Sequence, residues 1–101
     1  MEQKAVYVID GHRINDRQSF YDEISEKLIP GVYWGRNLDA FDDILRGGFG
    51  TPDAGFIIRW DAAEESRLAL GSELFDTLVE IIRDHGAGGR RARDGVELQL
   101  A

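Results

Sequence analysis

The sequence contains no cysteine and no long apolar run. Without cysteine the chain has no disulfide bond, no thiolate nucleophile and no zinc–thiolate site. No stretch approaches the roughly 20 apolar residues that are needed to cross a bilayer. The first ten residues, MEQKAVYVID, also lack the long apolar region and the cleavage site of a signal peptide, so we expect a cytoplasmic protein.

Basic residues are fewer than acidic residues, 12 against 19, which gives a net charge of −7. Nucleic acids and anionic membranes attract positive surfaces, so this balance argues against both as direct partners and leaves a basic protein open as a partner. The chain is 43% hydrophobic and 31% charged, which is ordinary for a folded protein. We therefore expect one domain spanning residues 1–101.

Three short segments are predicted strands. Residues 5–9 (AVYVI) are apolar and β-branched, which is typical of a strand buried on both faces, and residues 55–60 (GFIIRW) form a second candidate. Residues 96–100 (VELQL) alternate between apolar and polar, which predicts a strand at a sheet edge.

Apolar residues at helical spacing predict four helices between these strands. The first runs from Asn15 or Asp16 to residue 28, and the second covers residues 38–45, with Asn37 as its cap and Gly47-Gly48 at its end. A third helix covers residues 61–70 with Asp61 as its cap, and the fourth runs from residue 72 to 86. The tract GAGGRRARDG, residues 86–95, predicts an exposed basic loop. Strands alternating with helices indicate an α/β fold with a small parallel sheet flanked by helices.

The second helix carries an unusual density of acidic residues. Its apolar stripe consists of Leu38, Phe41, Ile44 and Leu45. Asp39, Asp42 and Asp43 avoid that stripe, so we expect all three to face solvent. An acid in the first turn suits Asp39, but like charges at i and i+4 repel each other, and aspartate is a mediocre helix former. A solvated surface and a binding site both remain open for this group.

Metal binding and acid–base catalysis are weaker alternatives. Clustered carboxylates can hold Mg²⁺, but such sites normally act on phosphates, and no GxxxxGK[ST] or strand-linked GxGxxG motif is present. His12 and His85 could form an acid–base pair, although isolated histidines are more often surface residues, and His85 falls where a helix end favours a cation. We therefore expect no metal, no cofactor and no enzymatic activity.

Two adjacent aromatic residues, Tyr33 and Trp34, precede the acidic helix. One of them can cover the core, and Trp34 is open between core and interface. An exposed tyrosine beside carboxylates suits a protein interface, because it offers a large area, little entropy to lose and a polar tip. Asp84 in the last turn of the final helix opposes the helix dipole, which hints at a purpose unless Arg83 and His85 compensate it.

These residues resemble a known family. The run YWGRNLDAFDDIL, residues 33–45, is similar to the barstar signature of aromatic residues, Gly-x-Asn-Leu-Asp-Ala, a hydrophobic residue and x-Asp-x-Leu. The first strand of that family and the turn after it are similar to AVYVIDGHRI, and its second strand and the short helix after it are similar to GFIIRWDAAEES. Residues 72–86 match its last helix. Three features depart from the family. Asp42 stands where the family prototype has a tryptophan, and Gly47-Gly48 replaces a segment that carries an aromatic residue, a role that Phe49 could take. The loop at 86–95 is longer and more basic than the family's short turn.

The resemblance implies a three-stranded parallel sheet flanked by helices and an intracellular inhibitor of secreted, guanyl-preferring ribonucleases. The second helix and the aromatic loop would occlude the nuclease active site in a 1:1 complex, with no nucleic acid involved and a monomer when free. By the same resemblance, Asp43 would occupy the phosphate site and Tyr33 would stack on the catalytic histidine. Asn37, Asp39 and Asp84 would lie beside them, with Trp34 and Asp42 as further contacts. A binding module for a different basic protein or toxin is the alternative.

Overall fold

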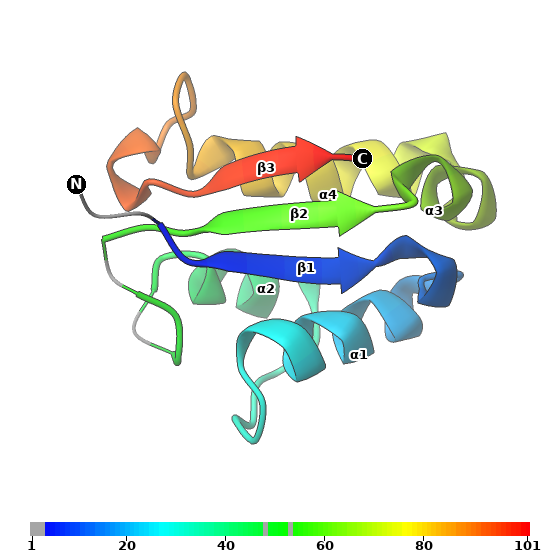
Figure 1. Cartoon of the computed structure of the whole chain (residues 1–101), viewed down its shortest axis with the longest axis horizontal. Helices are drawn as coiled ribbons and strands as arrows, with labels where there is room; N and C mark the ends of the chain where they lie inside the picture. The colour runs from blue at the N-terminus through cyan, green and yellow to red at the C-terminus, as the bar shows by residue number, and fades with distance from the viewer. Residues whose placement is uncertain (1–3, 48, 53) are drawn as a thin grey trace.

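The computed structural model describes residues 4–47, 49–52 and 54–101, and the colours of Figure 1 follow the chain through its elements. In chain order these are β1 (Val6–Asp10), η1 (Gly11–Arg13), α1 (Arg17–Leu28), α2 (Leu38–Ile44), β2 (Ile57–Asp61), α3 (Ala63–Leu70), α4 (Ser72–Asp84), η2 (Ala92–Asp94) and β3 (Glu97–Leu100). No helix among the described residues is both long enough and apolar enough to span a membrane.

The three strands form one parallel sheet in the order β1-β2-β3. Val8 lies beside Arg59 and Arg59 beside Gln99, so the register is continuous across the sheet. Helices α1, α2 and α4 lie on one face, and α3 lies at the carboxyl end of the strands (Figure 1). The predicted α/β class is confirmed, and β3 lies at a sheet edge as its alternating sequence predicted.

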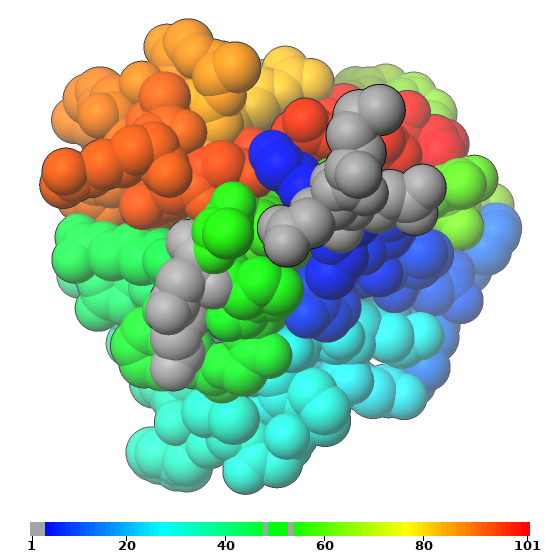
Figure 2. Space-filling model, turned by 60° about the vertical axis from the view of Figure 1, so that its left-hand side comes forward, coloured from blue at the N-terminus to red at the C-terminus, as the bar shows by residue number. Residues whose placement is uncertain are grey.

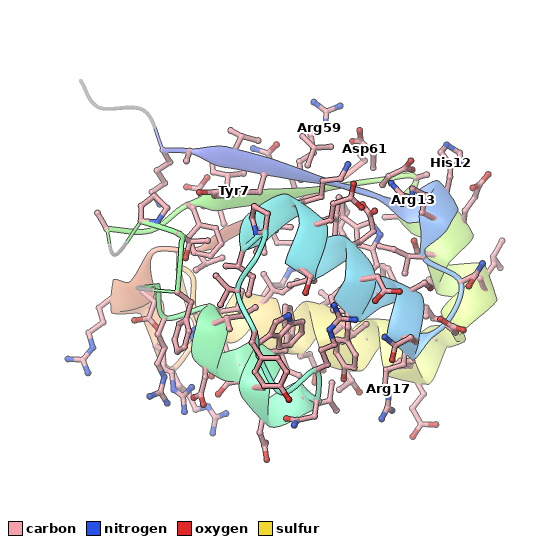
Figure 3. The ribbon with its side chains drawn as sticks, turned by 90° about the horizontal axis from the view of Figure 1, so that it is seen from below. Tyr7, His12, Arg13, Arg17, Arg59 and Asp61 are labelled. Atoms are coloured by element: carbon pink, nitrogen blue, oxygen red, sulfur yellow. The ribbon has the colours of Figure 1, made fainter. Side chains whose placement is uncertain are left out.

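The other face of the sheet is open, since no helix among the described residues covers it. Val6 and Val8 of β1 are 53% and 42% exposed, whereas Ile9 of the same strand is fully buried. Arg59 extends from the open face, away from the helices (Figure 3). The prediction that residues 5–9 are buried on both faces is therefore wrong, because the helices of the described chain cover only one side and the side chains of a strand alternate.

Aromatic side chains join the helices to the sheet. The ring of Phe20 in α1 lies 5.2 Å from Phe41 of α2 and 5.3 Å from Trp60 of β2, and Trp60 lies 5.0 Å from Phe75 of α4. Trp60 also donates from Nε1 to Ser66 in α3 at 2.9 Å. Helix α2 is thus fixed to the core through Phe41, although it is only seven residues long.

A side-chain hydrogen bond caps the N-terminus of α1 but not that of α3 or α4. Asp16 caps α1, accepting from Ser19 N at 2.7 Å in a capping box, as one of the two predicted caps. Asp61 does not cap α3: it ends β2 and accepts from Arg59 at 2.7 Å, and Ala62 precedes the helix with φ 52° and no side-chain cap. Helix α2 ends at Ile44, followed by a turn in which Gly47 N donates to Ile44 O. Gly48, the second glycine of the predicted stop, lies outside the described residues.

Candidate functional site

A groove of about 390 Å³ separates α2 from α4. Its lining consists of Leu38, Asp39, Asp42, Thr77, Glu80, Ile81, Asp84 and Arg90. The α4 members follow the i, i+3, i+4, i+7 spacing from Thr77, so they share one face of that helix. Acidic residues from two helices therefore converge around a partly apolar floor of Leu38 and Ile81, which is a surface suited to a cationic ligand.

Helix α2 presents two carboxylates on its outer side. Asn37 begins the helix, its Oδ1 accepting from Ala40 N at 2.8 Å, while Phe41 and Ile44 are buried. Asp39 and Asp43 are exposed and lie about 6 Å apart along the axis. The Asp43 side chain is 59% exposed, and its ion pair with Arg46 has a separation of 3.9 Å. Because such an exposed pair contributes little, Asp43 is available to a partner.

Asp42 is turned inward, unlike its neighbours. Its Oδ1 lies 2.7 Å from His85 Nε2, and its Oδ2 accepts from Arg91 Nη1 at 2.5 Å. His85 is fully buried, and its Nδ1 lies 2.6 Å from Asp94 Oδ2. The prediction that all three aspartates face solvent is therefore wrong for Asp42, and the prediction of a surface His85 is wrong as well. The segment after α4 folds back against α2, as the adjoining orange and green surfaces in Figure 2 show, and this contact encloses both groups.

This cluster determines how Asp42 titrates. Partial burial acts to raise the pKa of Asp42, but the hydrogen bonds from His85 and Arg91 together outweigh burial and hold that pKa below its usual 3.8. Asp42 therefore stabilises the fold above its unfolded-state pKa, and this contribution is lost as the pH falls through the lower folded-state pKa.

Replacing Asp42 with asparagine should lower the free energy of unfolding near neutral pH, and the difference from the wild type should shrink at an acidic pH below the lowered folded-state pKa of Asp42. Urea unfolding of both proteins at the two pH values measures the difference. An equal loss at both pH values would show that the asparagine acts through packing rather than through charge.

Asp84 is also engaged within the chain. Its Oδ1 accepts from the backbone N of Arg90 at 3.0 Å and from Nε of Arg90 at 3.1 Å. The side-chain and backbone hydrogen bonds from Arg90 lower the pKa of Asp84. The sequence suggested compensation by Arg83 and His85. Arg90 in the loop after the helix supplies most of it, and His85 makes a smaller contribution. The Asp84 side chain is 17% exposed, so a partner would meet Arg90 before it met this carboxylate.

The aromatic pair before α2 divides between surface and core. Tyr33 is 97% exposed, whereas Trp34 is 7% exposed and donates from Nε1 to Ser25 at 2.5 Å. The Trp34 ring also packs edge-on against Tyr21 at 5.4 Å. Arg36, at φ 49°, turns the chain into α2 and binds Asp22 at 2.6 Å. The open assignment of Trp34 is thereby decided in favour of the core, where it supports the loop that presents Tyr33.

The family model described as Barstar (barnase inhibitor) matches residues 4–101. The chain belongs to the barstar family. None of the curated proteins compared with the chain matches it. The barstar family is a family of inhibitors rather than enzymes, so the expected class of function agrees with the family.

Glu80 is a candidate site residue of this barstar-family chain that sequence reasoning missed. It is exposed and lines the groove opposite Asp39. The available signal was its spacing of four residues from Asp84, which repeats the spacing of Asp39 and Asp43. Together, Asp39 and Glu80 give the groove exposed carboxylates from two helices, and the exposed Asp43 lies one turn beyond Asp39 on α2.

The two histidines of this barstar-family chain are far apart in the fold. His12 belongs to η1, which follows the carboxyl end of β1, and contacts Glu65 of α3. His85 lies beyond α4 at the start of the last strand segment, where its carbonyl accepts from Val96 N at 3.0 Å. These positions are at opposite ends of the sheet, so they do not form the acid–base pair considered from the sequence. Among the described residues, no three His, Asp or Glu side chains are placed to hold a metal ion.

Proposed function

We propose that this barstar-family chain inhibits a secreted, guanyl-preferring ribonuclease by covering its active site in a 1:1 complex. The observation that carries this proposal is the pair of exposed carboxylates, Asp39 and Asp43, on a helix that Phe41 and Ile44 fix to the core. A ribonuclease active site is a concave basic pocket built for phosphates. Carboxylates held at a fixed spacing can replace phosphates there and accept charge-assisted hydrogen bonds from arginine.

The surrounding residues support the same proposal. Glu80 adds a carboxylate across the groove, and Tyr33 offers an exposed ring for stacking on an imidazole of the enzyme. Because α2 is already capped by Asn37 and packed, little conformational entropy would be lost on binding. The net charge of −7 would accelerate encounter with a basic enzyme and make the association rate fall as salt increases. We further propose that the free inhibitor is a cytoplasmic monomer.

Titration of a guanyl-preferring secreted ribonuclease with the purified chain tests the proposal. We expect RNA cleavage to fall linearly and to vanish at one inhibitor per enzyme. Complex formation should be slower in high salt than in low salt, because screening weakens long-range attraction. Full cleavage at a several-fold excess of the chain in low salt would contradict the proposal.

A second partner class follows from Arg90, which lies against Asp84 and neutralises one of the acids that the family resemblance assigns to the interface. A barstar-like module with this feature could recognise a different basic protein or toxin. Failure to inhibit guanyl-preferring ribonucleases, together with salt-sensitive 1:1 binding to another basic toxin, would favour this alternative.

A further inference from the structure

A second pocket, of about 220 Å³, lies beside the acidic groove between α2 and α4 and is lined mainly by positive charge. Its lining consists of Arg46, Arg91, Arg93 and Asp94. Arg46 directly follows the C-cap of α2, and the other three belong to the segment around η2. Three arginines around one concavity are unexpected in a chain with a net charge of −7. The basic loop noted in the sequence is therefore used in two ways: Arg90 faces the groove, and Arg91 and Arg93 face this pocket.

The guanidinium groups of this arginine pocket retain unused donors. Arg91 is held in place by Asp42, which accepts from only one of its nitrogens, Nη1. Within residues 4–47, 49–52 and 54–101, Arg46 and Arg93 donate no side-chain hydrogen bond, and the nearest acid to Arg46 is Asp43 at 3.9 Å. Each guanidinium carries five N–H groups in a planar fork. Most of the donors around the pocket are thus free for a ligand.

The charges around the pocket also favour an anion. The lining itself holds three positive groups against one carboxylate, Asp94. Asp94 is bonded to His85 at 2.6 Å, and Asp42 behind it is bonded to His85 and Arg91. Within the described residues, Arg46 and Arg93 therefore carry the least compensated charge around the pocket.

We propose that the arginine pocket binds a phosphate group as a dianion, held by Arg46, Arg91 and Arg93. Three guanidinium groups match the three terminal oxygens of a phosphate monoester, whereas a carboxylate has only two oxygens and a single charge. The contact between Asp42 and Arg91 orients one of the three arginines before the ligand arrives. The site requires no ribonuclease, so its existence is independent of the proposed inhibitory function.

The test uses the free full-length chain and inorganic phosphate, followed by NMR of backbone amides and arginine side chains at constant ionic strength. We expect saturable shifts confined to residues 45–47 and 90–95, with chloride causing no comparable change. Arg93→Gln and Arg46→Gln should each weaken phosphate binding by about ten-fold, since each removes a charge-assisted, multidentate contact. Arg59→Gln is the matched control: it removes the same charge from the open face of the sheet and should leave the affinity unchanged.

Two further arms of the test determine the source and the specificity. A nucleoside monophosphate that binds more tightly than inorganic phosphate, with the same dependence on Arg93, would identify a nucleotide as the source, and equal affinity would identify free phosphate. The proposal is overturned if phosphate causes no saturable shifts, or if Arg46→Gln and Arg93→Gln bind phosphate as the wild type does while retaining its backbone spectrum. Equal weakening by Arg59→Gln would also overturn it, because binding would then reflect net charge alone.

Discussion

Asp43→Ala is expected to weaken binding to the target ribonuclease by at least about 30-fold, which corresponds to about 2 kcal/mol and to the usual threshold of an interface hot spot. Asp43 is exposed on the outer side of α2, and its contact with Arg46 at 3.9 Å competes weakly with a partner. In the complex its carboxylate would be desolvated against the cations of the active site. Its removal would leave those cations buried without a partner, which accounts for most of the expected loss.

Stopped-flow association and dissociation rates measure this loss in its two components. We expect the dissociation rate to rise strongly and the association rate to fall modestly, because one charge of many is removed. Asp76→Ala is the matched control, since Asp76 is an exposed acid that lies on α4 rather than on α2. A change of only a few-fold in affinity for Asp43→Ala would show that α2 is not the binding face. An equal loss in Asp76→Ala would show that total charge matters more than position.

His85→Ala is expected to have the largest effect on folding stability, a loss of about 3 kcal/mol and a fall of roughly 10–20 °C in the midpoint of thermal unfolding. His85 is fully buried and lies between the carboxylates of Asp42 and Asp94. Without the imidazole, both carboxylates lose a hydrogen bond in a partly buried setting, and a cavity remains beside α2. An unpaired polar group in such a place costs much more than the original pair contributes.

Urea unfolding at neutral pH measures the effect, and His12→Ala is the matched control. The His12 side chain is 66% exposed and pairs with Glu65 at the surface, so its loss should change stability by less than about 0.5 kcal/mol. His85→Ala should also weaken ribonuclease binding, because the contact through Asp42 helps to hold α2 in position. Near wild-type stability in His85→Ala would contradict the structural importance of this cluster.

Local patterns in the sequence were sufficient for the elements and for the outward placement of two candidate site residues. Alternating and helical spacings predicted the strands and helices, and their alternation predicted the parallel sheet, since these signals depend on neighbours a few residues apart. The same spacing placed Asp39 and Asp43 on the outer side of α2, where the structure has them. Asn37 was recognised as a cap because capping is also local.

Contacts between distant segments decided the remainder. Asp42 is oriented by His85 and Arg91, which lie 43 and 49 residues away, so no periodicity within α2 could reveal its inward position. The burial of Trp34 depends on Ser25 in another helix, and Glu80 joins the site only because α4 packs beside α2. The sequence by itself determined an acidic helix with an apolar inner stripe. Only the folding of residues 85–91 against α2 and the end of α4 decided which acids stay exposed. It brought arginines and a histidine to Asp42 and Asp84 and left the others in water.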